Sequence, residues 1–253
     1  MSSKEPAPPS ASWRWAKRVV PPFARRRIGG MRMWLRHRPP VGLVRFGSLR
    51  RVTPISRRWG YDRGLPIDRY YIEAFVEEHR RDIRGTVLEV REPGYTYQFG
   101  SDVKHSEVID IDPDNTVATI VADLADAPQV PDASFDCVIV TQTLQLIYDV
   151  RAAVDTIHRI LKPRGVVLAT FPGISPVASE AEADHWRFTI ESATRVFADR
   201  FGDGAVEVRS YGNVLTATAF LFGLASRELR AGELAVHDPR YGLVVAVRAV
   251  RPS

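Results

Sequence analysis

The feature that most constrains the fold of this chain is a series of short apolar runs in its central part. Each run is five or six residues long, and the runs occupy residues 86–90, 107–111, 117–121, 135–140 and 166–170. This length and composition are typical of strands that are buried on both faces of a parallel sheet. Strands that alternate with helical segments indicate an α/β fold with a doubly wound sheet.

The segments around these runs have helical signals. Pro66 suits the first turn of a helix, and the apolar residues at 67–76 recur at helical spacing. Residues 150–161 predict a second helix that ends at 162–165, and Thr189 is a suitable cap for a helix through Phe201. The long apolar stretch at 214–225 predicts a buried helix. Two late runs, 205–210 and 243–250, predict a closing antiparallel pair, which completes a mostly parallel, seven-stranded sheet.

The bulk composition excludes several classes of protein. Hydrophobic residues make up 45% of the chain and charged residues 26%, as in ordinary soluble globular proteins. No apolar run reaches the roughly 18 residues of a membrane span, and Arg and Pro interrupt every apolar stretch near the start, so we expect a cytoplasmic protein without a signal peptide. Cys137 is the single cysteine, which excludes an internal disulfide and a cysteine-based metal cluster. The six scattered histidines likewise predict no metal site.

Charge divides the chain into two parts. Residues 1–58 hold fifteen Lys or Arg and one acid, whereas residues 59–253 hold twenty basic and twenty-nine acidic residues. We therefore predict a basic, partly disordered N-terminal arm (1–58) and a main domain (59–253). The arm could pack its aromatic residues on the main domain and expose its arginines, or contact a phosphate-bearing substrate, nucleic acid or an anionic membrane. We expect a small-molecule acceptor as the partner and do not expect nucleic acid.

Five motifs in register resemble class I S-adenosylmethionine-dependent methyltransferases. They occupy residues 86–90, 108–112, 122–124, 131–137 and 161–165. The resemblance spans residues 66–250 and is strongest to a branch of small bacterial methyltransferases with the motifs found here at 141–145 (TQTLQ) and 186–189 (WRFT). It implies a Rossmann-like fold, S-adenosylmethionine as the cofactor, and a small-molecule acceptor, because such domains often occur near glycosyltransferases or in secondary metabolism.

Acidic residues at the predicted strand ends suit this cofactor. Asp110 follows Glu89 by 21 positions, about the interval at which doubly wound nucleotide-binding folds place the acid that binds the ribose hydroxyls. Asp112 would face the same side of the strand and is the alternative. The resemblance implies that Asp123 contacts the adenine amino group, with the backbone of Leu124 beside it. Both Asp110 and Asp123 could instead cap a turn.

The loop after the first predicted strand departs from the family pattern. Where the family has Glu-x-Gly-x-Gly-x-Gly, this chain has EVREPGYTY at residues 89–97. Gly94 alone remains of the glycines, and Arg91 and Glu92 occupy positions that small residues normally fill. The short connection to the next strand predicts that the usual first helix is reduced to a turn. We expect Gly94, Tyr95 and Thr96 to lie along the amino-acid end of the cofactor; the alternative is weak or lost binding.

Methyl transfer to an acceptor atom is an in-line displacement, so much of its rate can come from positioning and desolvation. His185 is the candidate general base because its ordinary pKa is near neutrality; alternatively, it is a loop histidine bonded to backbone. The remaining candidates are Thr141 for the cofactor and Gln142, Gln145, Trp186, Arg187 and Tyr211 for the acceptor.

Two other functions compete with a methyltransferase. One is a non-catalytic, methyltransferase-like module that binds a partner through the basic arm. The other is a nicotinamide-dependent oxidoreductase, which would require a Gly-x-Gly-x-x-Gly loop that opens a helix; residues 89–97 lack it. The sequence leaves the acceptor, the arm's role and homo-oligomer formation undetermined.

Overall fold

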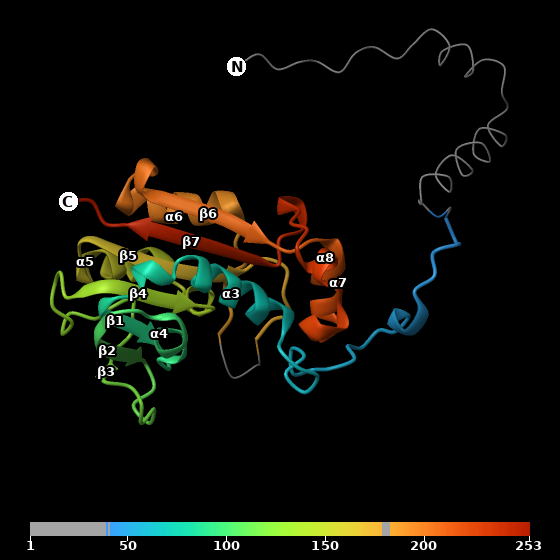
Figure 1. Cartoon of the computed structure of the whole chain (residues 1–253), viewed down its shortest axis with the longest axis horizontal. Helices are drawn as coiled ribbons and strands as arrows, with labels where there is room; N and C mark the ends of the chain where they lie inside the picture. Colours follow the sequence, from blue (N-terminus) through green and yellow to red (C-terminus); the bar gives the residue numbers. More distant parts are fainter. Residues whose placement is uncertain (1–38, 40, 179–182) are drawn as a thin grey trace, which may run out of the picture. The chain divides into compact units, whose positions relative to one another are not determined.

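The computed structural model describes residues 39, 41–178 and 183–253 (Figure 1). The chain divides into two units, Met1–Val52 and Thr53–Ser253. The described part of the first unit contains one turn of 3-10 helix, η1 (Gly47–Leu49). Residues 1–38 and 40 of the predicted basic arm, with the partial disorder predicted for it, lie outside the described residues.

The second unit is built on a seven-stranded sheet in the order β3-β2-β1-β4-β5-β7-β6 (Figure 1). β7 runs antiparallel to both β5 and β6, and every other neighbouring pair is parallel. The predicted doubly wound, mostly parallel sheet with a closing antiparallel pair is therefore confirmed. The strands are β1 (Gly85–Val90), β2 (Val103–Asp110), β3 (Ile120–Val121), β4 (Phe135–Thr141), β5 (Leu161–Pro172), β6 (Val206–Tyr211) and β7 (Val244–Val250).

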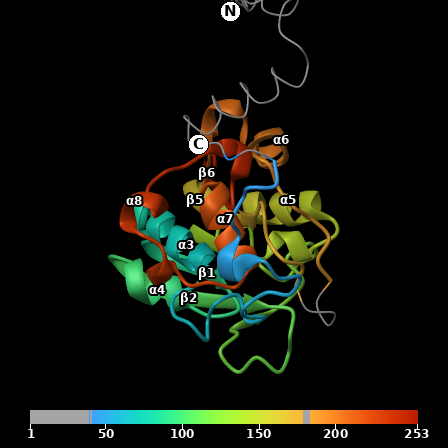
Figure 2. The same cartoon turned by 90° about the vertical axis from the view of Figure 1, so that its right-hand side faces the viewer.

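Helices cover both faces of the sheet (Figure 2). Alternate residues of β4 show the two cores: Val138 and Val140 pack in one apolar cluster, and Cys137 and Ile139 in the other. The first cluster lies under α5 (Val150–Ile160) and α6 (Ile190–Phe201). The second lies under α3 (Ile67–Glu78), the short α4 (Gly94–Phe99) and α7 (Val214–Leu221), with α8 (Ala231–Leu234) beside α7. No helix in the described ranges is long and apolar enough to span a membrane.

The predicted cap of α6 is confirmed. The hydroxyl of Thr189 accepts a hydrogen bond from the backbone N–H of Ser192 at 3.1 Å, and the hydroxyl of Ser192 accepts one from the backbone N–H of Thr189 at 2.9 Å. These two bonds satisfy donors that a helix N-terminus leaves without intrahelical partners.

Three predicted strands differ from those observed. β2 begins at Val103, four residues before the predicted start. Only residues 120–121 of the run 117–121 form a strand, because Asn115 folds the preceding residues into a turn: its backbone carbonyl accepts from the N–H of Ala118 at 3.1 Å. β5 begins at Leu161, five residues before the predicted start, and its register with β4 shifts after that residue. The bulge requires Gly165, because a Cβ there would lie 2.9 Å from the carbonyl oxygen of Lys162.

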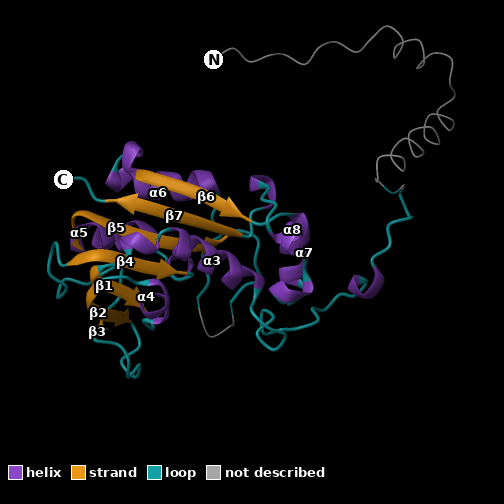
Figure 3. Ribbon diagram, in the orientation of Figure 1, coloured by secondary structure: helices purple, strands orange, loops and turns teal. Residues whose placement is uncertain are grey.

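The carboxyl ends of β1, β2 and β4 meet at one edge of the sheet (Figure 3). In doubly wound sheets, ligands bind in the crevice outside this edge.

Candidate functional site

A cavity of about 730 Å³ lies at the carboxyl ends of β1, β2 and β4, bordered by α3 and α4. This volume falls within the range of small-molecule and cofactor pockets, about 300–1,000 Å³. Seven of the residues selected from the sequence line it together: Glu89, Gly94, Tyr95, Asp110, Asp112, Thr141 and Gln142.

Glu89 holds the loop after β1 in place. Its carboxylate is almost fully buried, at 3% exposure, and accepts the backbone N–H of Tyr95 at 3.0 Å and that of Thr96 at 2.8 Å. The hydroxyl of Thr96 donates to the same carboxylate at 2.7 Å. Burial raises the pKa of Glu89, while the bonds from Thr96 and Tyr95 act in the opposite direction. Glu89 therefore attaches the start of α4 to β1 through its side chain.

Asp110 and Asn115 connect the ends of β1 and β2. The Asn115 amide donates to Asp110 at 2.6 Å and to the backbone carbonyl of Arg91 at 2.8 Å. The other oxygen of Asp110 accepts the N–H of Asp112 at 3.1 Å. Asp110 is half-buried and Asp112 is exposed. A carboxylate oxygen accepts more than one hydrogen bond, so the Asp110 carboxylate keeps acceptor capacity toward the cavity.

Two cavity residues have left-handed backbone conformations, which side chains other than glycine rarely adopt. They are Arg91, with φ of 72°, directly after β1, and Gln142, with φ of 50°, directly after β4. Within the described part of the chain, the Nε2 of Gln142 is buried and has no hydrogen-bond partner. Strained backbone and unpaired buried donors are both costly, and both are enriched at functional sites.

Asp123 and Leu124 do not line the cavity. Asp123 is exposed after β3, and its carboxylate accepts the N–H of Ala125 at 2.8 Å, which is the contact of a turn cap. Leu124 is buried in the apolar cluster under α5 and α6.

Gln145 and His185 lie beside each other next to the loop after β4, and neither lines the cavity. The backbone carbonyl of Gln145 accepts from the N–H of His185 at 2.9 Å, which attaches this segment to the loop after β4. The ring of His185 is exposed and meets Tyr148 edge-on, with centroids 5.3 Å apart. Among the described residues, the Oε1 of Gln145 and the hydroxyl of Thr170 are also buried without partners. Polar groups therefore remain unsatisfied at the ends of both β4 and β5.

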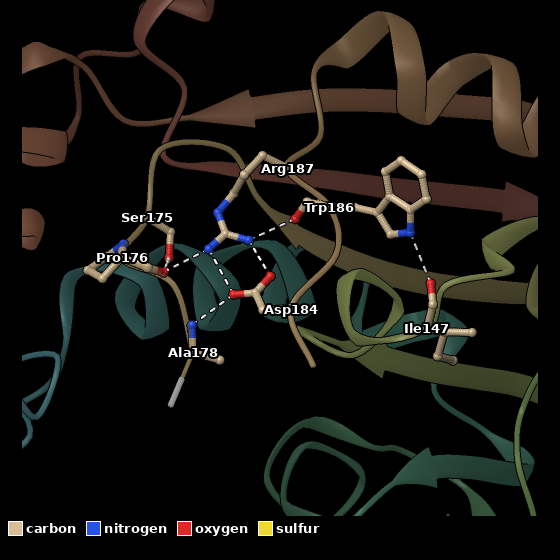
Figure 4. A network of polar contacts seen from close by, with 7 residues as sticks. All are labelled: Ile147, Ser175, Pro176, Ala178, Asp184, Trp186 and Arg187. Atoms are coloured by element: carbon tan, nitrogen blue, oxygen red, sulfur yellow. Dashed lines mark hydrogen bonds and ion pairs between the residues drawn. The ribbon is translucent and has the colours of Figure 1, made fainter. Parts of the chain in front are cut away.

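Trp186 and Arg187 make structural contacts around the same segment (Figure 4). The indole of Trp186 donates to the carbonyl of Ile147 at 3.1 Å. The guanidinium of Arg187 pairs with both oxygens of Asp184, one at 2.8 Å, and donates to the carbonyl of Pro176 at 2.9 Å. Its hydrogen bonds hold the pKa of Asp184 below its ordinary value. Neither Trp186 nor Arg187 lines the cavity.

Tyr211 lies apart from these residues in the sequence-selected set. It is buried in the cluster under α3, where its ring meets Tyr71 and His237. It does not line the cavity either. Among the described residues, no group of three or more His, Cys, Asp or Glu side chains could hold a metal ion.

Sequence reasoning missed several cavity residues. Arg69 and Glu73 of α3 line the cavity with Tyr61, and Asn115 joins them from the β2 side. The two α3 charges resemble the solvent-facing residues of any amphipathic helix, so only the packing of α3 beside this edge shows their position. One sequence feature could have indicated Asn115 as a cavity residue, because it follows Asp112 closely in a turn-forming segment.

Comparison with known proteins identifies the domain. Residues 98–169, from α4 to β5, match the family model described as a methyltransferase domain. Together with the seven-stranded order, this match shows a Rossmann-like methyltransferase fold of class I. The chain thus carries a methyltransferase domain, for which S-adenosylmethionine is the cofactor. No curated protein sequence matches it.

Solved structures with a similar fold include N-methyltransferase NodS from Bradyrhizobium japonicum WM9 in complex with S-adenosyl-L-homocysteine. The two chains are 12% identical, and the match covers 79% of this chain and 95% of that one, with a TM-score of 0.49. An S-adenosylmethionine-dependent methyltransferase from Mesorhizobium loti has 16% identity, covers 73% and 98%, and has a TM-score of 0.49. The [4+2]-cyclase SpnF has 15% identity, covers 72% and 81%, and has the same TM-score. These values support no statement about the acceptor.

The residues present fit the cofactor. Asp110 offers a carboxylate to the ribose hydroxyls, and the buried amide of Gln142 offers a donor without a partner in the described structure. The loop after β1 leaves room for the cofactor without a glycine-rich pattern. Its residues Arg91 and Glu92 are exposed, and the space beside Gly94 is open.

Proposed function

We propose that this protein transfers a methyl group from S-adenosylmethionine to a small-molecule acceptor, a sugar or natural product, with anionic acceptors among the candidates. The observation that carries the proposal is the single cavity that brings Asp110, Asp112, Thr141 and Gln142 together at the carboxyl edge of the sheet. The cofactor supplies an already activated methyl group, so the protein's task is to position the acceptor in line and exclude water.

In this proposal, Asp110 binds the ribose hydroxyls, and Asp112 is the alternative. Asp110 has the stronger support because it is half-buried and fixed by Asn115, whereas Asp112 is exposed. Asp123 is retained as the candidate for the adenine amino group, with Leu124 beside it, although its present contact is a turn cap.

The acceptor would lie where β4 and β5 end. The unpartnered side-chain atoms of Gln142, Gln145 and Thr170 support this placement, because an acceptor with hydroxyl groups would satisfy them. His185 borders the same region and would accept a proton from an acceptor that keeps one at neutral pH. Trp186 and Arg187 would contribute by fixing the segment that carries His185.

Calorimetric titration with S-adenosylhomocysteine tests the cofactor site. Loss of the Asp110 carboxylate leaves two ribose hydroxyl donors without an acceptor, which costs about 1–3 kcal/mol, roughly 5- to 150-fold in Kd. We expect this loss in Asp110→Ala, a smaller one in Asp112→Ala, and none in Asp114→Ala, a nearby exposed acid outside the cavity. Unchanged affinity in both Asp110→Ala and Asp112→Ala would remove the proposal and favour a non-catalytic binding module.

Turnover tests the base. His185→Ala should lower the rate of methyl transfer while leaving the affinity for S-adenosylhomocysteine unchanged, because the ring does not line the cavity. Full activity in this variant would show that positioning alone drives the reaction.

A further inference from the structure

Two opposite charges on α3 face the cavity. Arg69 and Glu73 both line it, and they are four residues apart, one turn of the helix. The apolar face of the same helix, which includes Tyr71, Ile72 and Phe75, is buried against the sheet. The helix therefore packs in a way that presents this charged pair to the cavity.

Arg69 donates its side-chain hydrogen bonds to neutral groups, and the charge of the neighbouring Asp68 also acts on it. Its Nε donates to the hydroxyl of Tyr61 at 3.0 Å, and one terminal nitrogen donates to the hydroxyl of Tyr95 at 3.1 Å. In the described part of the chain, no acidic side chain forms an ion pair with it. Guanidinium has five N–H donors in a planar fork that matches a carboxylate, so Arg69 keeps donors for an anion.

Glu73 is half-buried and, within the described residues, its carboxylate has no hydrogen-bond partner. Burial raises its pKa, and the nearby charge of Arg69 acts against that shift. A half-buried carboxylate without a hydrogen-bond partner is stabilised in its charged form by a cation placed beside it. The two side chains thus offer one site for a negative group and one for a positive group on the same helix face.

The carboxylate of Glu89 already holds the loop after β1 in place. Both oxygens of Glu89 already accept hydrogen bonds, from the N–H of Tyr95 and from the N–H and hydroxyl of Thr96. The charged residues of the loop, Arg91 and Glu92, line the cavity but are exposed, whereas Arg69 and Glu73 line it from α3 and are half-buried.

We infer that Arg69 binds the carboxylate, and Glu73 the ammonium group, of the amino-acid end of the cofactor. α3 thereby takes over a task that the divergent loop does not perform. This inference rests on the proposed cofactor site, in which Asp110 binds the ribose at the β2 side of the same cavity.

Three ligands separate the two ends of the site in calorimetric titrations of the full chain. S-adenosylhomocysteine carries both groups, 5′-S-(3-carboxypropyl)-5′-thioadenosine lacks the ammonium group, and 5′-methylthioadenosine lacks the whole amino-acid end. Arg69→Gln should weaken S-adenosylhomocysteine about 10- to 100-fold, the effect of one lost charge-assisted contact, and leave methylthioadenosine unchanged. Glu73→Gln should weaken S-adenosylhomocysteine but not the carboxypropyl analogue.

Arg80→Gln and Glu77→Gln are matched controls, because this exposed pair near the end of α3 does not line the cavity. Circular dichroism confirms that each variant is folded. Unchanged affinity for S-adenosylhomocysteine in Arg69→Gln, or an equal loss for methylthioadenosine, overturns the inference. A wild-type protein that binds none of the three ligands overturns the cofactor site itself, which Asp110→Ala tests separately.

Discussion

Replacing Arg187 with glutamine should loosen the segment that carries His185. The side chain of Asp184 is 4% exposed, so the variant leaves a nearly buried carboxylate without its cation. Removing one partner of a buried pair costs about 3–5 kcal/mol. Arg187 is itself 29% exposed, so water can replace part of the interaction, and we expect about 2–3 kcal/mol.

The assay is hydrogen exchange at the backbone N–H of Ala178, which donates to Asp184 at 2.8 Å. A loss of about 2 kcal/mol should speed its exchange roughly 30-fold. A double-mutant cycle with Asp184→Asn should give a coupling of about 1–3 kcal/mol. The same cycle on Arg195 and Glu191, an ion pair with side chains 76% and 74% exposed, should give at most about 0.5 kcal/mol.

The effect should also depend on pH. The pKa of Asp184 is lowered from its ordinary value of 3.8, chiefly by its hydrogen bond from Arg187. The resulting stabilisation is therefore present above that value and is lost as the pH falls through the lower folded pKa. Wild type and Arg187→Gln should differ by a constant amount between about pH 5 and 8 and converge in stronger acid. Equal protection of Ala178 in both proteins at pH 7 would refute this reasoning.

Three further predictions concern local contacts. Glu89→Ala removes the acceptor of two backbone N–H groups and should lower the free energy of unfolding by about 1–3 kcal/mol in thermal denaturation. Glu92→Ala, at an exposed position, is the control, and equal stability of the two variants would contradict this prediction. Asn115→Ala breaks the contact with Asp110 and should weaken the binding of S-adenosylhomocysteine and of methylthioadenosine alike, by about 3- to 10-fold in titrations. A selective effect on the binding of one ligand would argue against a role of Asn115 at the nucleoside end. Thr189→Ala should cost about 1 kcal/mol in urea denaturation through loss of the cap of α6, and no change would show that packing alone fixes this helix.

The sequence predicted the fold well because buried strands and capped helices have local signatures. The run at 135–140 and the cap at Thr189 depend on neighbours in the sequence, and both appear in the structure as expected. The start of β5 could not be predicted, because residues 161–165 pair with β4 around a bulge. A Cβ on Gly165 would also lie 3.1 Å from the carbonyl oxygen of Phe135 on β4, a contact that only the folded sheet creates.

The candidate site could be predicted only in part. Glu89 and Asp110 lie at the carboxyl ends of β1 and β2, so topology alone brings them to one edge, where they line the cavity. Arg69 and Glu73 come from a helix whose placement beside that edge depends on tertiary packing. Their charges carry no local mark that distinguishes them from the exposed charges of the same helix.

The contact between Glu89 and Thr96 has a consequence for how relatives of this protein can be recognised. A glycine-rich loop restricts the sequence at several positions, because only glycine lets its backbone approach a ligand without steric cost. Here a carboxylate and a hydroxyl seven residues apart fix the loop, so the residues between them can vary in size and charge. The family model accordingly begins to match at Gln98, past this loop. A search pattern that pairs an acid at the end of the first strand with Ser or Thr seven residues later should detect methyltransferases that a glycine signature passes over.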